Sequence, residues 1–192
     1  MGKIFIVRHG QDTDNVAKIL NGRRDTELTD LGREQAKATA QKLAAAYSIK
    51  IIYSSPLKRC YETARIIAEF LHVDEIIVDE HLIEREFGIL TGKPLADIPK
   101  YTDKILHSDG VNYFLEAEGT EDFSSAYERG KKILDEIKER HPQDNILIVT
   151  HGDTGKMIRA AFHDWGWEKG LMMPYFDNAS VLELFNTQDI IN

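Results

Sequence analysis

The sequence has one cysteine, Cys60, among its 192 residues. A single cysteine cannot form an internal disulfide or supply a zinc site built from several cysteines. Long apolar segments are also missing, because the longest apolar runs have about five residues, whereas a membrane-spanning helix needs about 20. These absences exclude a disulfide scaffold and an integral membrane protein, and they leave a globular fold.

Positive charge is in deficit. Lys and Arg number 24 against 32 Asp and Glu, which gives a net charge of −8. This balance argues against non-specific binding to nucleic acid or to an anionic membrane. The chain opens with a strand-like run, Ile4–Val7, and not with the long apolar segment of a signal peptide. We therefore expect a cytoplasmic protein with no nucleic-acid or membrane partner.

The length fits one domain over residues 1–192. Apolar runs alternate with helical patterns, which predicts an α/β fold with helices packed on a sheet. Two runs, within residues 4–7 and 146–149, are apolar throughout, as is typical of parallel strands buried on both faces. The predicted strands cover residues 3–8, 49–53, 75–78, 145–150 and 180–185. The predicted helices cover about 30–47, 57–71, 121–140 and 154–163.

Local signals place the helix ends. Thr29 or Asp30 can cap the first helix, and Ser55 followed by Pro56 is a typical start for the second. Residues 88–119 hold Gly, Pro and mixed polar residues with weak periodicity. We expect them to form an excursion from the sheet that determines specificity.

Two segments resemble each other, residues 4–10 and 146–152, and both end in His-Gly. Each predicts a buried strand that ends at a histidine, His9 or His151. Ligands of parallel sheets bind beyond the carboxyl ends of the strands, so two neighbouring strands would bring both imidazoles to one crevice. The alternative is that each histidine only forms local hydrogen bonds at the end of its strand.

Two arginines accompany the histidines. Arg8 precedes His9, and Arg59 lies in the first turn of the predicted second helix, just after another strand end. A helix N-terminus attracts anions, and a guanidinium adds paired donors that suit phosphate. A solvated position for Arg59 is the alternative.

These residues belong to a set of motifs that spans nearly the whole chain. The set comprises Arg8-His9-Gly10 with Asn15, Gly22 with Asp25 and residues 28–36, residues 54–59 with Thr63-Ala64, residues 82–88, and Thr150-His151-Gly152. In content and order the set resembles the histidine phosphatase superfamily, the phosphoglycerate mutase-like proteins. The resemblance implies a three-layer α/β/α sandwich with a mostly parallel central sheet.

The resemblance also implies a mechanism. His9 would be the nucleophile that accepts the phosphoryl group, Glu84 the proton donor, and His151 a catalytic partner. No metal and no cofactor would be needed, because arginines neutralise the phosphate charge. The phosphate-binding residues would be Arg8, Asn15, Asn21, Gly22, Arg59 and Gly152.

The proton donor needs a raised pKa. At its reference pKa of about 4.3, a glutamic acid is only ~0.2% protonated at pH 7. A shift of roughly two units, or about 3 kcal/mol, is required, and a bound phosphate dianion can supply it by repulsion. Glu86 is the alternative donor to Glu84, and a solvated acidic turn is the alternative for both.

Asp12 departs from the resemblance, because this position usually holds Ser or Thr. Thr13 supplies a hydroxyl only if the register slips by one residue, and then Asn15 no longer aligns. A carboxylate beside an anion site weakens phosphate binding unless an arginine pairs with it. We expect Asp12→Ser to lower the KM for a phosphomonoester, with arginine pairing as the exception.

The sequence favours a metal-independent phosphatase that acts on a phosphorylated small molecule. A phosphoglycerate mutase-type transferase is the first alternative, although the stretch after Phe87 is short for a mutase. A metallohydrolase with His9, Glu84, His151 and Asp153 as ligands and a non-enzymatic phospho-ligand-binding module are the others. The sequence determines neither the substrate nor whether the protein forms a homodimer.

Overall fold

Five strands form the central sheet of the computed structural model, which describes residues 2–185. They lie in the order β3-β2-β6-β1-β7, and all neighbours are parallel except β7, which is antiparallel to β1. Their bounds are β1 Ile4–Arg8, β2 Ile51–Ser54, β3 Ile76–Val78, β6 Ile146–Thr150 and β7 Val181–Leu184. All five predicted strands are confirmed.

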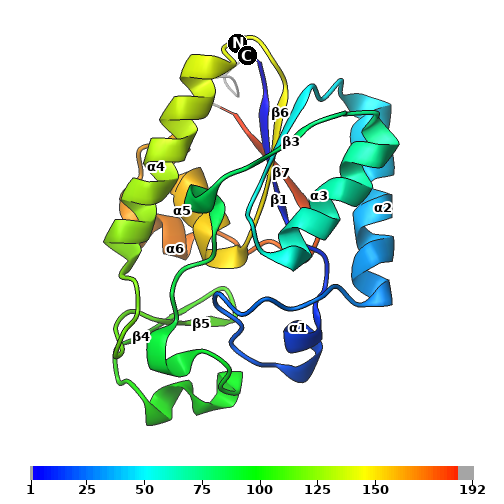
Figure 1. Cartoon of the computed structure of the whole chain (residues 1–192). Coiled ribbons are helices and arrows are strands. Elements are labelled where there is room, and N and C mark those ends of the chain that lie inside the picture. Colours follow the sequence, from blue (N-terminus) through cyan, green and yellow to red (C-terminus); the bar gives the residue numbers. More distant parts are fainter. Residues whose placement is uncertain (1, 186–192) are drawn as a thin grey trace.

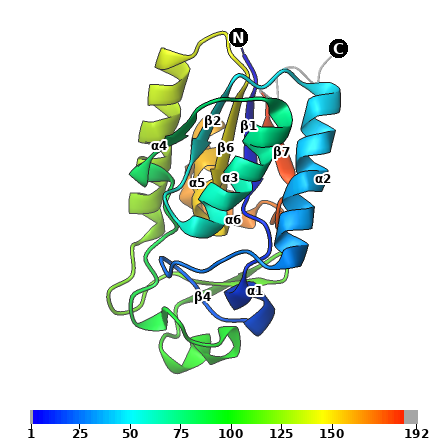
Figure 2. The ribbon, with the colours of Figure 1, turned by 45° about the vertical axis from the view of Figure 1, so that its right-hand side comes forward.

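Helices cover both faces of this sheet. On one face lie α2 (Asp30–Ala46) and α3 (Lys58–Leu71), and on the other lie α4 (Phe123–Arg140) and α5 (Gly152–Phe162) (Figures 1 and 2). A further helix, α6 (Gly166–Met172), packs beside α4 and α5. The predicted three-layer α/β/α sandwich is confirmed.

The strand sequences explain why both faces are covered. In β1, Ile4 and Ile6 pack under α4 and α5, whereas Phe5 and Val7 pack under α2 and α3. The neighbouring strand β6 divides its residues in the same way. Because successive side chains of a strand point to opposite faces, a run that is apolar at every position requires two covered faces.

Three helix starts test the cap predictions. The Thr29 hydroxyl accepts a hydrogen bond from the Gly32 amide at 3.0 Å and caps α2, as predicted. The start of α3 was predicted wrongly, because α3 begins at Lys58 without a side-chain cap, and the Ser55 hydroxyl instead lies 2.7 Å from His151 Nε2. Helix α5 begins at Gly152, two residues earlier than predicted.

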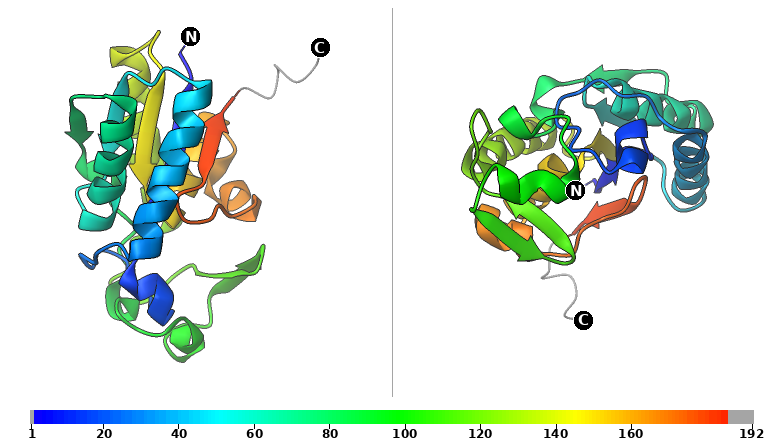
Figure 3. Two further views of the ribbon diagram at one scale, coloured as in Figure 1. Left: turned by 90° about the vertical axis from the view of Figure 1, so that its right-hand side faces the viewer. Right: turned by 90° about the horizontal axis from the view of Figure 1, so that it is seen from below.

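A small lobe lies beyond the carboxyl ends of β1, β2 and β6, as the views in Figures 1 and 3 show. It contains α1 (Thr13–Ala17), two short 3-10 helices and a hairpin of β4 (Ile105–Ser108) and β5 (Val111–Phe114). The 3-10 helices η2 and η3 cover Gly88–Leu90 and Leu95–Lys100, and a further one, η1 (Glu80–Leu82), precedes the lobe. The lobe has its own apolar cluster, which consists of Leu20, Phe87, Leu90, Ile98 and Phe114. The lobe includes the expected excursion at residues 88–119.

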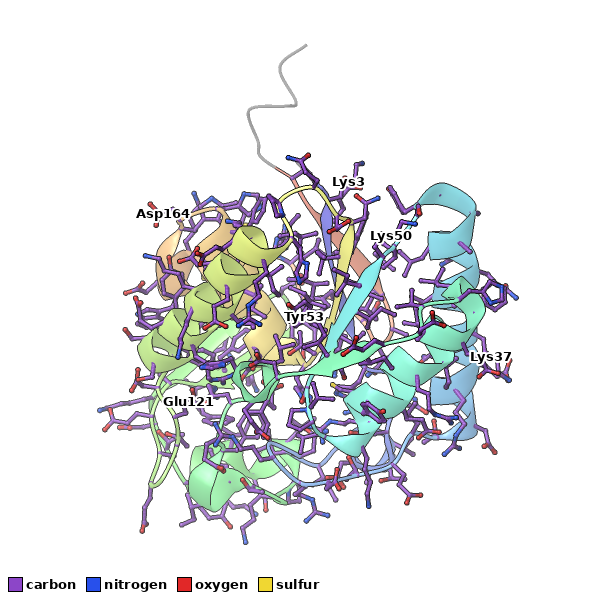
Figure 4. All side chains as sticks on the ribbon, turned by 45° about the horizontal axis from the view of Figure 1, so that its top comes forward. Lys3, Lys37, Lys50, Tyr53, Glu121 and Asp164 are labelled. Carbon is purple, nitrogen blue, oxygen red and sulfur yellow. The ribbon has the colours of Figure 1, made fainter. Side chains whose placement is uncertain are left out.

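The outer surfaces of the helices carry side chains that face solvent, whereas side chains between the sheet and the helices are buried. Lys37 lies at the outer edge of the molecule, on the α2 side, and Glu121 lies where the chain leaves the lobe for α4 (Figure 4). Tyr53 is 1% exposed and packs between the sheet and α4. Within residues 2–185, no helix has the length and apolar character needed to cross a bilayer.

Candidate active site

Strand register brings the two His-Gly motifs together. Arg8 at the end of β1 pairs with Thr150 at the end of β6, so His9 and His151 are the next residues of adjacent parallel strands. Their ring centroids are 5.3 Å apart. The two imidazoles therefore share one site, as the sequence repeat predicted.

His9 has a defined tautomer. Its Nδ1 lies 2.8 Å from the Gly10 carbonyl oxygen, which can only accept a hydrogen bond. The proton must be on Nδ1, so the lone pair is on Nε2, where it accepts a hydrogen bond from Arg59. Burial, and then the charges of Arg59 and Arg8, lower the pKa of His9 well below its ordinary value. His9 is thus neutral at pH 7 and available as a nucleophile.

Arg59 is fully buried beside the nucleophilic nitrogen. Its Nε lies 3.3 Å from His9 Nε2, and its terminal nitrogens donate to the carbonyl oxygens of Gly22 and Arg24 and to the Thr26 hydroxyl. Most of its five N–H donors are therefore used within the protein. The alternative of a solvated Arg59 is wrong.

Asp12 is the counterion of Arg59. Its Oδ2 lies 3.4 Å from Arg59 Nε, and both side chains are 0% exposed. Asp12 also caps α1 by accepting from the Asn15 amide at 2.7 Å, and it accepts from Asn21 and Thr26 at 2.7 and 2.9 Å. The exception anticipated for this position, an arginine paired with the carboxylate, is the arrangement found.

A cavity of about 330 Å³ opens in front of His9, between the end of the sheet and the lobe. The sequence-predicted residues on its wall are Arg8, His9, Asn15, Asn21, Glu84 and Gly152. Three other predicted residues, Gly22, Arg59 and His151, are not on the wall. Arg59 and His151 are fully buried, and both contact the His9 ring.

Two contacts hold Arg8 in the cavity wall, where it can reach a ligand. One terminal nitrogen donates to the Phe176 carbonyl oxygen at 3.4 Å, and the guanidinium lies 5.0 Å from the centre of the Tyr175 ring. Its buried Nε has no hydrogen-bond partner within the described structure. An unsatisfied buried donor is costly, and an anion in the cavity would remove that cost.

The amide of Asn15 is oriented by its neighbours. Its Oδ1 accepts from the Asp12 amide at 3.4 Å and from Asn178 Nδ2 at 3.0 Å. Asn178 is fixed in turn, because its Nδ2 also donates to the His9 carbonyl oxygen at 3.0 Å. Since the oxygen of Asn15 is occupied, its NH2 group remains available to donate to a phosphoryl oxygen.

Gly152 opens α5 at the cavity wall, where the free N–H groups of a helix N-terminus favour an anion. A Cβ at this position would lie 2.0 Å from the Tyr175 hydroxyl oxygen. The glycine therefore allows Tyr175 to close over the helix N-terminus, and any larger residue would displace it.

Glu84 lies at the same helix N-terminus. It is 5% exposed, and its carboxyl accepts from the amides of Arg85, Asp153 and Thr154 at 2.9–3.3 Å. Burial, and then the negative charge of Asp153, raise the pKa of Glu84, while these amide hydrogen bonds oppose the shift. The protein thus makes Glu84 a weaker acid than a free glutamic acid before any phosphate arrives.

Glu86 occupies a different environment. Its side chain is 36% exposed, lies 3.8 Å from Arg23, and accepts from the Gly88 amide outside the cavity wall. Glu84 is therefore the better placed proton donor. A solvated acidic turn, the alternative for both residues, is wrong for Glu84.

Two wall residues had no sequence signal. Tyr175 and Asn178 belong to the irregular segment before β7, which repeats no motif and has no periodicity. The Asp12–Arg59 pair was anticipated only as an exception, since residues far apart in the chain become partners through the fold.

The metallohydrolase alternative requires clustered ligands. Within residues 2–185, no group of three or more His, Cys, Asp and Glu side chains is arranged to hold a metal ion. His9, Glu84, His151 and Asp153 line or adjoin one site without forming such a group.

Comparisons with known proteins agree with this geometry. The model of the histidine phosphatase superfamily (branch 1) matches residues 4–189. The chain therefore belongs to the histidine phosphatase superfamily, and the resemblance seen in the sequence is confirmed. Several relatives are named as phosphatases, which agrees with the prediction of a phosphatase.

Three relatives illustrate the range. Putative phosphoserine phosphatase 2 of Hydrogenobacter thermophilus is 35% identical over 188 residues, which are 96% of this chain and 89% of that protein. Phosphoglycerate mutase-like protein 4 of Arabidopsis thaliana is 34% identical over 153 residues, 78% of this chain but only 66% of the plant protein. A mycobacterial glucosyl-3-phosphoglycerate phosphatase, solved with VO3, superimposes with a TM-score of 0.82 at 25% identity and covers 95% of this chain and 90% of its own.

Proposed function

We propose that this protein hydrolyses phosphomonoesters without a metal ion, through a phosphohistidine intermediate on His9. One observation carries the proposal. The neutral His9 imidazole, with an unprotonated Nε2, and the buried carboxyl of Glu84 line the same cavity. A nucleophile and a proton donor on one cavity are what transfer of a phosphoryl group from an ester to a side chain requires.

In the first step, the lone pair of His9 Nε2 forms a bond to phosphorus as the bond from phosphorus to the ester oxygen breaks. Glu84 gives its proton to that oxygen, so the leaving group departs as a neutral alcohol and Glu84 becomes a carboxylate. The negative charge on the phosphoryl oxygens faces Arg8, the Asn15 amide and the N-terminus of α5 at Gly152. Positioned donors of this kind stabilise the charge of the transition state.

In the second step, water attacks phosphorus while the Glu84 carboxylate accepts a proton from it. The bond from His9 Nε2 to phosphorus breaks, its electron pair returns to the imidazole, and inorganic phosphate leaves. Glu84 ends protonated and His9 ends neutral, so both residues regain their initial states. Arg59 and His151 both contact the His9 ring, and Nε2 exchanges its hydrogen bond from Arg59 Nε for the bond to phosphorus in the first step and regains it in the second.

The cavity suits a small substrate. Besides the predicted phosphate-binding residues, its wall includes the apolar residues Leu20, Val111 and Phe114 and a further cation, Lys18. A relative is named as a putative phosphoserine phosphatase, and phosphoserine is therefore the first substrate to test. A cytoplasmic location stays a prediction from the sequence, which leaves open whether the protein forms a homodimer.

The test is a phosphatase assay with p-nitrophenyl phosphate and a panel of metabolite phosphates, in the presence of EDTA. We expect turnover that EDTA leaves unchanged and that His9→Ala abolishes. Loss of activity in EDTA would favour a metallohydrolase. Conversion of a phosphoglycerate into its isomer, without release of phosphate, would favour a mutase, and binding without turnover would favour a non-enzymatic module.

A further inference from the structure

Two buried acidic residues, Glu84 and Asp153, are neighbours at the N-terminus of α5. The backbone N–H of Asp153 donates to Glu84 Oε2 at 3.3 Å, and both residues line the cavity. Glu84 is 5% and Asp153 is 8% exposed. The proposed reaction uses only Glu84, so the role of Asp153 is open.

The surroundings of the two carboxyls differ. Asp153 Oδ2 accepts from Arg85 Nε at 2.9 Å, whereas Glu84 forms no ion pair with an arginine or lysine among residues 2–185. A guanidinium does not lose its proton in a protein. Asp153 therefore carries its negative charge as half of an ion pair, and Glu84 has no equivalent counterion.

Arg85 cannot move to share its charge with Glu84. Its side chain is fully buried, and its terminal nitrogens donate to the carbonyl oxygens of Glu121 and Phe114 at 3.0 and 3.2 Å. The guanidinium also lies 4.1 Å from the ring centres of both Phe114 and Phe123. These contacts fix the cation on the Asp153 side of the carboxyl pair.

We propose that Asp153 is a positioning residue for proton transfer: its fixed negative charge, anchored by Arg85, keeps the transferable proton of the pair on Glu84. The proposal rests on the function proposed above. Two neighbouring carboxyls with unequal surroundings divide into one ionised and one protonated group, and here the immobile arginine decides which is which.

Other charged and titratable groups lie near Glu84. Arg8 and the neutral His9, from the end of β1, line the same cavity. Arg59, from α3, opposes protonation of Glu84, but its charge is balanced by Asp12. Burial raises the pKa of Tyr175, from the segment before β7, to about 12, so its hydroxyl stays neutral. Burial also raises the pKa of the Cys60 thiol, on α3, which stays neutral too.

The proposal separates substrates by their leaving group. An alkyl ester such as glycerol 2-phosphate needs a proton on its leaving oxygen, whereas p-nitrophenolate is stable as an anion and leaves without one. A change that ionises Glu84 must therefore slow the first reaction far more than the second. A change that merely loosens the fold would slow both.

The test compares Asp153→Asn with Asp177→Asn. In Asp153→Asn the new amide oxygen can still accept from Arg85 Nε, so the variant removes the charge and keeps the hydrogen bond. Asp177 is exposed, lies next to Asn178 and forms no side-chain contact with Glu84 within the described structure, so it controls for a distant change of charge. For each variant, kcat/KM is measured for both substrates across pH.

For Asp153→Asn we expect kcat/KM for glycerol 2-phosphate at pH 7 to fall about tenfold, and its alkaline limb to move down by about one pH unit. The value for p-nitrophenyl phosphate should change by less than about twofold, and Asp177→Asn should change neither value by more. Retention of the wild-type rate and pH profile on glycerol 2-phosphate by Asp153→Asn would overturn the proposal, as would equal losses on both substrates. If the wild type hydrolyses neither substrate, the proposed function fails instead.

A second measurement does not depend on a folded Asp153 variant. The infrared spectrum of the wild type at pH 7 should show the carbonyl band of a protonated, buried carboxyl group that is absent from Glu84→Gln. In Asp153→Asn, where it folds, this band should be lost at pH 7. A wild-type spectrum without the band would contradict the proposal.

Discussion

Replacing Asp12 by asparagine tests the charge balance behind the nucleophile. In Asp12→Asn one oxygen is kept and can still cap α1 through the Asn15 amide. The other oxygen becomes an NH2 group that faces three donors, on Asn21, Thr26 and Arg59. Arg59 is then a fully buried cation without its counterion.

The structure sets the size of the effect. Breaking a buried ion pair by removing one partner costs about 3–5 kcal/mol, because the remaining charge is left uncompensated. For a chain of this size about 1 kcal/mol corresponds to 2–4 °C, so we expect Tm to fall by roughly 6–20 °C. Asp14→Asn is the matched control, since Asp14 pairs at 2.8 Å with Arg24, whose side chain is 47% exposed. Asp14 itself is 7% exposed, but the cation that its removal leaves behind is solvated, so we expect a smaller loss of stability than in Asp12→Asn.

Urea unfolding at pH 7 measures both variants. Equal losses of stability in Asp12→Asn and Asp14→Asn would refute the reasoning, because the burial of the Asp12–Arg59 pair would then have no consequence. The same pair changes the kinetic expectation. The sequence alone led us to expect a lower KM in Asp12→Ser unless an arginine paired with the carboxylate; since Arg59 does, we now expect KM to rise as Arg59 and Asn21 lose their anchor.

Two further predictions concern pH and the Asn15 amide. Burial lowers the pKa of both His9 and His151 in the folded protein, so the unfolded chain binds protons first as the pH falls below about 6.5. The stability that these histidines provide is fully present above that pH and declines below it, by up to ~1.4 kcal/mol per pH unit and histidine. The raised pKa of Glu84 acts in the opposite direction over the same range, so the test compares two chains by urea unfolding: between pH 7.5 and 5.5, His151→Gln should lose about 1.4 kcal/mol less stability than the wild type. An equal pH dependence in both chains would contradict this. In Asn178→Asp a carboxylate replaces the amide that donates to the Asn15 oxygen and the His9 carbonyl oxygen, and it repels both acceptors. The Asn15 amide should then turn its oxygen toward the phosphoryl group, and kcat/KM should fall about tenfold or more. An unchanged kcat/KM in a stably folded variant would show that this orientation does not matter.

The regular part of the fold could be predicted from the sequence. Strands β1 and β6 are apolar at every position that faces the helices, which only a doubly covered parallel sheet explains, and the matching His-Gly ends then fix where the site lies. The lobe could not be predicted in the same way. Elements of three to six residues, such as η2, η3 and the β4–β5 hairpin, are too short to show a period.

The candidate site was predictable where it sits at strand ends and in motifs, as for His9, Arg8 and Glu84. The depth of a side chain in the site was not predictable, because a sequence does not reveal whether Arg59 lines the cavity or is buried next to it. Pairs of residues that lie far apart in the chain could not be predicted for the same reason. Asp153 entered the sequence analysis only as a candidate metal ligand, and its pairing with Arg85, 68 residues away, appears only in three dimensions.

The most direct test of a phosphohistidine on His9 is to trap the enzyme during turnover and locate the phosphoryl group. A phosphohistidine is labile in acid and stable in alkali, so label from a phosphorylated substrate should survive an alkaline quench, disappear on acid treatment and map to the peptide that contains His9. The label should be absent from His9→Asn. Label that withstands acid, or that maps to any residue other than His9, would contradict the central claim.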